Sequence, residues 1–156
     1  MEEQKYNLKE SLAELDKLFD LSAKETDKTA CEALAEKARI IYEQYPESED
    51  IALRYARILF TLSTKQTVLK ELETTAEKLQ KLQQQFPESH DIAEAFARIL
   101  FNLSTEQTEL KELETTAKKL QKLQQKFPES HDIALQYANI LVNLSAKQTV
   151  LKERMP

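Results

Sequence analysis

Hydrophobic residues recur at spacings of three and four along most of the chain, which is the spacing of one face of an α-helix. In residues 48–63 the apolar positions cover a wide arc: Ile51, Ala52, Tyr55, Ala56, Ile58, Leu59 and Leu62. Such an arc predicts a helix that is covered by neighbours on more than one side. Residues 67–86 carry a narrower stripe opposite a face of Lys, Glu and Gln, which predicts a helix with one side in water.

The alternation of broad and narrow stripes runs through the sequence and predicts an all-α protein. We expect about seven helices and a C-terminal stub, at residues 7–21, 26–45, 48–63, 67–86, 89–104, 108–127 and 130–145, with the stub at 148–154. Local signals set the boundaries. Pro46 and its equivalents end helices because proline cannot continue a helix interior, and Ser48 is a good N-cap for the next one. Ser22 and Glu25 have the spacing of a capping box.

The boundary motif Pro-Glu-Ser-x-Asp-Ile-Ala occurs three times with a constant period of 41 residues, at 46–52, 87–93 and 128–134. Segments 45–85 and 86–126 align without gaps and match at 31 of 41 positions. A fixed period of this size is the signature of a solenoid of stacked supersecondary units. We therefore expect one helical-repeat domain over residues 1–156. Its repeats fall at about 5–45, 46–86 and 87–127, with a partial repeat at 128–156.

The sequence around each proline resembles the tetratricopeptide repeat. The run 82–89, Leu-Gln-Gln-Gln-Phe-Pro-Glu-Ser, is followed by Ile92, Phe96, Ala97 and Leu100, with an aromatic residue directly before a small one. The same pair occurs at Tyr55-Ala56 and Tyr137-Ala138. The period departs from the family's repeat of about 34 residues, and Ala and Ile or Leu replace the family's Gly-Tyr side of the pattern.

The resemblance implies a right-handed α-solenoid of stacked antiparallel helix pairs. It also implies that the first helix of each pair lines a concave face, and that this face binds a protein or peptide. The lengthened period leaves the superhelix pitch and groove width open.

Composition and charge narrow the function classes. The chain has no glycine, 31% charged residues and a net charge of −5, which favours helices and argues against a nucleic-acid partner. No apolar run approaches the roughly 20 residues of a membrane span, and the N-terminus lacks the pattern of a signal peptide. We expect a soluble cytoplasmic protein that has no membrane partner.

Candidate chemistry is sparse. Without glycine there is no phosphate-binding loop, and no nucleophile motif is present, so we expect neither an enzyme nor a cofactor. His90 and His131 lie one period apart with no Cys or His at ligand spacing, so we expect no metal site. Cys31 is equivalent to Leu72 and Leu113, which predicts a buried thiol in the core.

The exposed arc of the first helices carries ladders of residues one period apart. One ladder is Asp16, Arg57, Arg98 and Asn139; a second is Phe19, Phe60, Phe101 and Val142; a third is Asp20, Thr61, Asn102 and Asn143; a fourth is Leu12, Leu53, Glu94 and Leu135. Residues three or four apart share a helix face. The predicted partner-binding residues are therefore Arg57, Phe60, Thr61, Arg98, Phe101, Asn102, Asn139 and Asn143. Apolar anchors beside donors for carboxylates or carbonyls suit peptide recognition.

A structural interpretation of the same ladders stays open. Phe60 and Phe101 can pack against the second helices, and the arginines can form surface ion pairs with Asp50, Glu94 or Glu49. Two functions remain: a scaffold that binds a peptide or helix on its concave face, or a self-assembling module. In the second, Leu144, Val150 and Leu151 leave the last helix uncovered, and its end pairs with another copy as a homo-oligomer.

Overall fold

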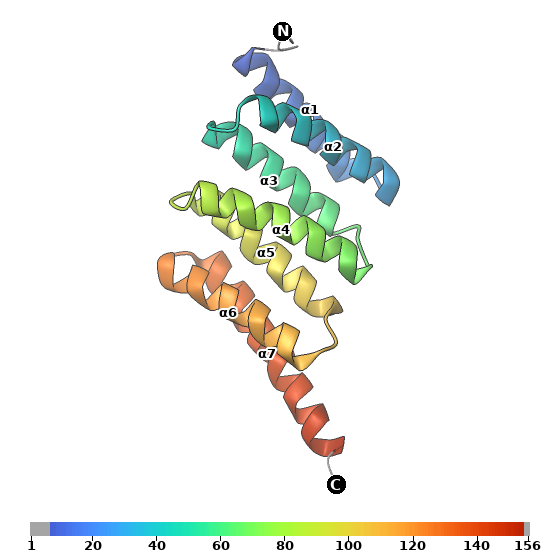
Figure 1. Ribbon diagram of the computed structural model, residues 1–156, viewed down its shortest axis with the longest axis vertical. Coiled ribbons are helices and arrows are strands. Elements are labelled where there is room, and N and C mark those ends of the chain that lie inside the picture. Colours follow the sequence, from blue (N-terminus) through green and yellow to red (C-terminus); the bar gives the residue numbers. More distant parts are fainter. Residues whose placement is uncertain (1–6, 155–156) are drawn as a thin grey trace.

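The computed structural model describes residues 7–154 and is all-α over that range (Figure 1). Its helices are α1 (Leu8–Lys24), α2 (Lys28–Gln44), α3 (Glu49–Ser63), α4 (Leu69–Gln85), α5 (His90–Glu106), α6 (Leu110–Lys126) and α7 (His131–Arg154). The predicted all-helical class and the order of the helix pairs are confirmed. Among these helices, none combines the length and hydropathy needed to cross a bilayer.

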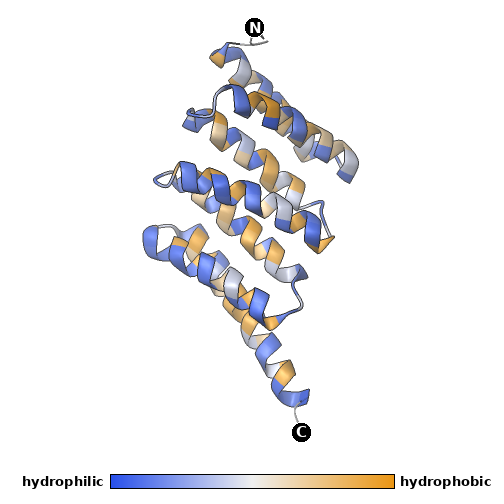
Figure 2. Ribbon diagram, viewed as in Figure 1, coloured by the Kyte–Doolittle hydropathy of each residue, from blue (hydrophilic) through white to orange (hydrophobic). Residues whose placement is uncertain are grey.

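The helices form two layers, and only in one of them do neighbouring helices contact each other. The odd-numbered helices contact one another in sequence, α1 with α3, α3 with α5 and α5 with α7. Each even-numbered helix packs on the two odd ones that flank it in the chain, but α2 and α4 have no backbone contact, and neither do α4 and α6. α3 and α5 are therefore each surrounded by four helices. Figure 2 shows the consequence, since α3 and α5 carry more hydrophobic positions than α4 and α6.

One core runs the length of the stack. In the odd layer it contains the aromatic–small pairs of α3 and α5, and Ala56 and Ala97 are fully buried. The even helices contribute a single leucine stripe, such as Leu72, Leu79 and Leu82 of α4. Cys31 takes the position of Leu72 in the first repeat and is buried as predicted, and this burial raises the pKa of its thiol.

The serine caps are confirmed. The Oγ atoms of Ser48, Ser89 and Ser130 accept hydrogen bonds from the backbone N–H three residues later, at 3.2, 3.2 and 3.1 Å. The capping box at Ser22 and Glu25 is wrong. α1 continues through Ser22 to Lys24, and Asp27 caps α2 by accepting from the N–H of Ala30.

The connection between α3 and α4 is held by a buried amide. The hydroxyl of Thr75 donates to the Oε1 atom of Gln66 at 2.9 Å, and Thr116 donates to Gln107 in the next repeat at the same distance. These bonds fix the chain where it leaves the first helix, because a buried polar side chain needs a partner.

The predicted break between residues 145 and 148 is wrong, because α7 runs without interruption from His131 to Arg154. Ala146 stands where the earlier repeats have Thr64 and Thr105, and alanine favours a helix more strongly than threonine does. The predicted stub at 148–154 is therefore the last part of α7.

The close crossing of the odd helices gives a test of the packing. Ala97→Leu should lower the free energy of unfolding by about 1–3 kcal/mol, because Ala97 is fully buried between helices and the larger side chain would overpack the site. Ala138→Leu is the matched control, since Ala138 is the equivalent residue of α7 and is exposed. It should change stability by no more than about 0.5 kcal/mol. Urea denaturation at a concentration where the chain is monomeric measures both; equal midpoints would contradict the assigned crossing.

Candidate protein-binding surfaces

The predicted arginines lie on the side of the odd helices that faces away from the even ones, whereas Asn102 and Asn143 line cavities that Leu72 of α4 and Leu113 of α6 also line. Tyr55 and Leu62 of α3 line a cavity between α2 and α4. Arg57 follows Tyr55 by two residues, which turns its side chain toward the opposite side of α3. The eight predicted residues on α3, α5 and α7 make up what we name the odd-helix face: Arg57, Phe60, Thr61, Arg98, Phe101, Asn102, Asn139 and Asn143.

Arg98 ties three helices of this face together. Its guanidinium carbon lies 5.8 Å from the ring centroid of Phe60 on α3, within the range of a cation–π contact. The same guanidinium forms an ion pair with Asp132 of α7. The fold therefore brings Arg98 to Phe60 of the preceding odd helix, whereas helix spacing grouped Arg98 with Phe101. Asp132 is a second partner that the sequence did not indicate.

Arg57 is the free cation of the odd-helix face. It is exposed, and within residues 7–154 its guanidinium has no hydrogen bond or ion pair. The equivalent of the Arg98–Asp132 pair would join Arg57 to Asp91, and that pair is not formed. The suggested pairing of Arg57 or Arg98 with Asp50, Glu94 or Glu49 is wrong. Glu94 instead accepts a hydrogen bond from the Ser130 hydroxyl at 2.6 Å.

Phe60 and Phe101 are half-buried and do not belong to the buried core. Asn139 is also half-buried, whereas Val142, which follows Phe60 and Phe101 in the second ladder, is 67% exposed. The aromatic edges of α3 and α5 therefore form a partly accessible surface beside Arg57.

Asn102 and Asn143 hold the odd helices to one another. The Nδ2 atom of Asn102 donates to Ser63 Oγ at 3.2 Å, and that of Asn143 donates to Ser104 Oγ at 3.3 Å. These two predicted binding residues therefore contribute to the stacking of neighbouring repeats. Thr61 stands at the equivalent position in α3, but its hydroxyl donates to the carbonyl of Arg57 in its own helix.

Because Thr61 does not donate to the preceding odd helix, a serine of α1 is left without a hydrogen-bond partner. Ser22 is the equivalent of Ser63 and Ser104, and its Oγ atom is buried without a hydrogen-bond partner. The sequence shows the Thr–Asn–Asn pattern, but only the structure shows that the asparagine reaches the serine of the preceding repeat.

A second kind of surface lies on the other side, in the spaces between even helices. A cavity of about 490 Å³ separates α4 from α6 over a floor that includes Phe96 and Leu103 of α5; we name it the α4–α6 groove. A cavity of about 260 Å³ separates α2 from α4 over Tyr55 and Leu62 of α3; we name it the α2–α4 groove. The Lys, Glu and Gln positions of the even helices predict faces in water, and this pattern did not indicate either groove.

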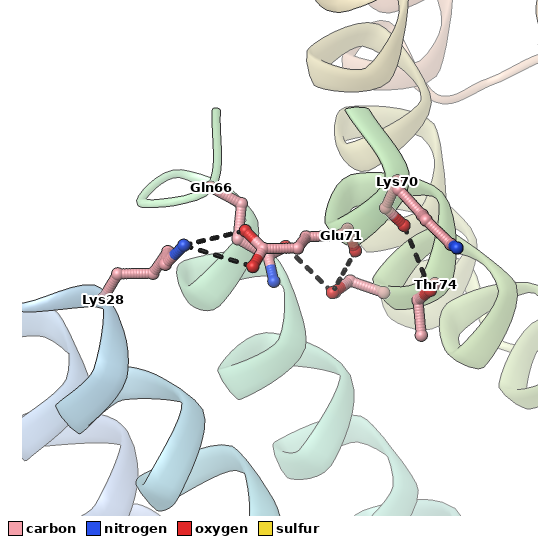
Figure 3. Close-up of polar contacts among 6 residues, drawn as sticks. Lys28, Gln66, Lys70, Glu71 and Thr74 are labelled. Carbon is pink, nitrogen blue, oxygen red and sulfur yellow. Dashed lines mark hydrogen bonds and ion pairs between the residues drawn. The ribbon is translucent and has the colours of Figure 1, made fainter. Parts of the chain in front are cut away.

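The two grooves are repeats of one site. Each residue that lines the α2–α4 groove has a counterpart 41 residues later that lines the α4–α6 groove. Figure 3 shows how Lys28 reaches from α2 across the α2–α4 groove to Glu71 at the start of α4. The Lys28 Nζ atom lies 2.9 and 3.1 Å from the two carboxylate oxygens, and this bond raises the pKa of Lys28. The 41-residue period is the sequence signal for these sites, because it places equivalent residues in both grooves.

One of the two histidines, His90, takes part in packing. The ring of His90, the first residue of α5, meets the ring of Phe127 edge to face, with centroids 4.7 Å apart. Within residues 7–154 no three His, Cys, Asp or Glu side chains gather as they would around a metal ion.

No protein-family model matches the chain, and comparison with curated proteins and with solved structures finds no match.

The unpaired Ser22 hydroxyl gives a test of the asparagine ladder. Thr61→Asn should raise the free energy of unfolding by about 0.5–1.5 kcal/mol, because the new amide can donate to Ser22 as Asn102 does to Ser63. Asn102→Thr is the reverse change in the next repeat and should lower stability by a similar amount. Guanidinium unfolding followed by circular dichroism measures both variants. If both changes move the unfolding midpoint in the same direction, the asparagine–serine hydrogen bonds do not contribute this stability.

Proposed function

We propose that the protein is an interaction scaffold that binds a peptide or helical segment of another protein on its odd-helix face. The observation that carries the proposal is the surface formed by the exposed Arg57 and the half-buried rings of Phe60 and Phe101. The rings offer apolar anchors and the guanidinium offers donors to a carboxylate or a carbonyl.

The layer spacing supports this choice of face. The odd helices are in contact and the even helices are not, so the stack is more tightly spaced on the odd side. A stack with such a difference curves toward the closely spaced layer, which makes the odd-helix face the concave one. This agrees with the tetratricopeptide-like arrangement, in which the first helix of each pair lines the concave face. The right-handed superhelix that this arrangement implies belongs to the same proposal.

Self-assembly is a second candidate, and α7 carries the observation that favours it. Leu135, Ala138 and Val142 are exposed and share one side of α7 because they are three and four residues apart. The equivalent of Ala138 in α5, Ala97, is fully buried against a neighbouring odd helix. The exposed side of α7 therefore offers a stacking surface to the α7 of a second copy.

Peptides selected from a random library on the immobilised protein test the scaffold. We expect the Arg57→Ala, Arg98→Ala variant to bind them roughly tenfold more weakly or worse, since charge-assisted hydrogen bonds are lost. Arg57→Ala alone is the cleaner variant, because Arg57 has no partner within the described chain and its loss leaves no buried charge. Lys81→Ala, which removes an exposed cation from α4, is the control. Equal affinities of all variants for every selected peptide would reject the odd-helix face.

Multi-angle light scattering tests the second candidate. Self-association through α7 predicts a mass that rises with protein concentration, and Val142→Lys should return it to the monomer mass, because a charge would be buried in the contact. Lys81→Glu, a charge change on an even helix, should leave the association unaltered. A monomer at every concentration would exclude this candidate.

A further inference from the structure

The two grooves between even helices are lined by equivalent residues but differ in how their carboxylates are paired. In the α2–α4 groove two of the three lining glutamates, Glu71 and Glu36, have cationic partners within the chain. Lys28 binds Glu71, as described above, and Arg39 binds Glu36 through its Nε atom at 2.9 Å. The Arg39 hydrogen bond lowers the pKa of Glu36, which keeps this carboxylate ionised and paired.

The α4–α6 groove has lost both cations. The equivalent of Lys28 is Leu69, and the equivalent of Arg39 is Gln80. The carboxylates themselves remain: Glu112 is the equivalent of Glu71, and Glu77 is the equivalent of Glu36. Within residues 7–154 neither has an ion pair.

Two further carboxylates line this groove. Glu73 has its counterpart, Glu32, in the α2–α4 groove, whereas Glu109 replaces Val68 of the preceding repeat. Against these four glutamates stand Lys111 and Lys119, and the Lys119 ammonium donates to the amide oxygen of Gln80 at 3.2 Å. The α4–α6 groove is thus a larger copy of the α2–α4 groove that lacks the two cations, Lys28 and Arg39, that bind glutamates in the first copy.

We propose that the α4–α6 groove binds a cationic segment of a partner protein, in which an apolar side chain is flanked by lysine or arginine. The ammonium of the segment takes the place on Glu112 that Lys28 takes on Glu71. A second cation lies near Glu77, as the Arg39 guanidinium lies on Glu36. The apolar side chain between them points to the floor formed by Phe96, Leu100 and Leu103.

A polypeptide is the occupant that the geometry favours. Lys28 itself belongs to a helix, so the α2–α4 groove shows that a lysine on a helical backbone reaches the glutamate with good geometry. The groove runs between two helices of 17 residues each, which leaves room along the axis for a segment of several residues. This site is separate from the odd-helix face, and the proposal does not depend on the function proposed above.

The probe is a labelled helical peptide with a central leucine and lysines four residues before and after it, against a second peptide in which glutamine replaces both lysines. Fluorescence anisotropy at near-physiological salt gives the dissociation constants. We expect the lysine peptide to bind the parent protein at least about tenfold more tightly than the glutamine peptide, because each ammonium meets an unpaired carboxylate.

The decisive variant is Leu69→Lys, Gln80→Arg, which restores to the α4–α6 groove the two cations of the other groove. It should weaken binding of the lysine peptide roughly tenfold or more. Leu110→Lys, Gln121→Arg is the matched control: it makes the same changes one repeat later, on α6, and neither residue lines the groove. The control should bind like the parent.

A second variant keeps the test valid if Leu69→Lys disturbs the packing of α4. Glu77→Gln, Glu112→Gln removes the carboxylates and should also abolish the preference for lysine. Arg57→Ala should leave that preference intact, which separates this site from the odd-helix face. Equal binding of the lysine peptide to the parent and to both groove variants overturns the proposal. So does an affinity that falls equally in the α6 control, or a parent dimer that the groove variants convert to monomer, which would identify a second copy as the occupant.

Discussion

The odd helices α3, α5 and α7 cross one another closely because α3 and α5 each carry a small residue directly after an aromatic one. Ala56 and Ala97 leave no side-chain atoms beyond Cβ, so the backbones of α3, α5 and α7 can approach, and the rings of Tyr55 and Phe96 fill the space toward the even layer. A contiguous odd layer makes α3 and α5 the most enclosed elements of the chain. Their wide apolar arcs are the sequence requirement for that enclosure.

The other features of the molecule depend on this spacing. Since the odd helices are close, a side chain as short as asparagine can bridge Asn102 to Ser63. Each even helix packs on two odd helices and does not contact another even helix, so grooves remain between the even helices. Long side chains such as Lys28 cross these grooves. The same packing therefore lets short side chains such as Asn102 and Ser63 join the odd helices, while longer ones such as Lys28–Glu71 and Lys119–Gln80 join the even helices.

The sequence is informative about the parts of this arrangement that local chemistry controls. Proline stops, serine caps and the two widths of apolar stripe predict the helices and their order, because each signal acts within a few residues. They fail at residues 145–148, where α7 continues as a helix although the equivalent segment after α3 is a turn in which Gln66 is bonded to Thr75. They also fail for Arg98, whose partner Asp132 lies on another helix and is one of many carboxylates that the sequence offers equally.

In an array of near-identical repeats, identical positions reflect duplication. Positions that differ show which interactions one repeat has and another lacks. Thr61 in place of asparagine leaves Ser22 without a partner, so the first crossing lacks a bond that the later two have. Leu69 and Gln80, where the first repeat has Lys28 and Arg39, leave the glutamates of the second groove unpaired. The first of these differences affects stability alone, because the serine is buried. The second lies on an accessible surface, where an uncompensated set of carboxylates around an apolar floor makes the site selective for the charge of what binds there.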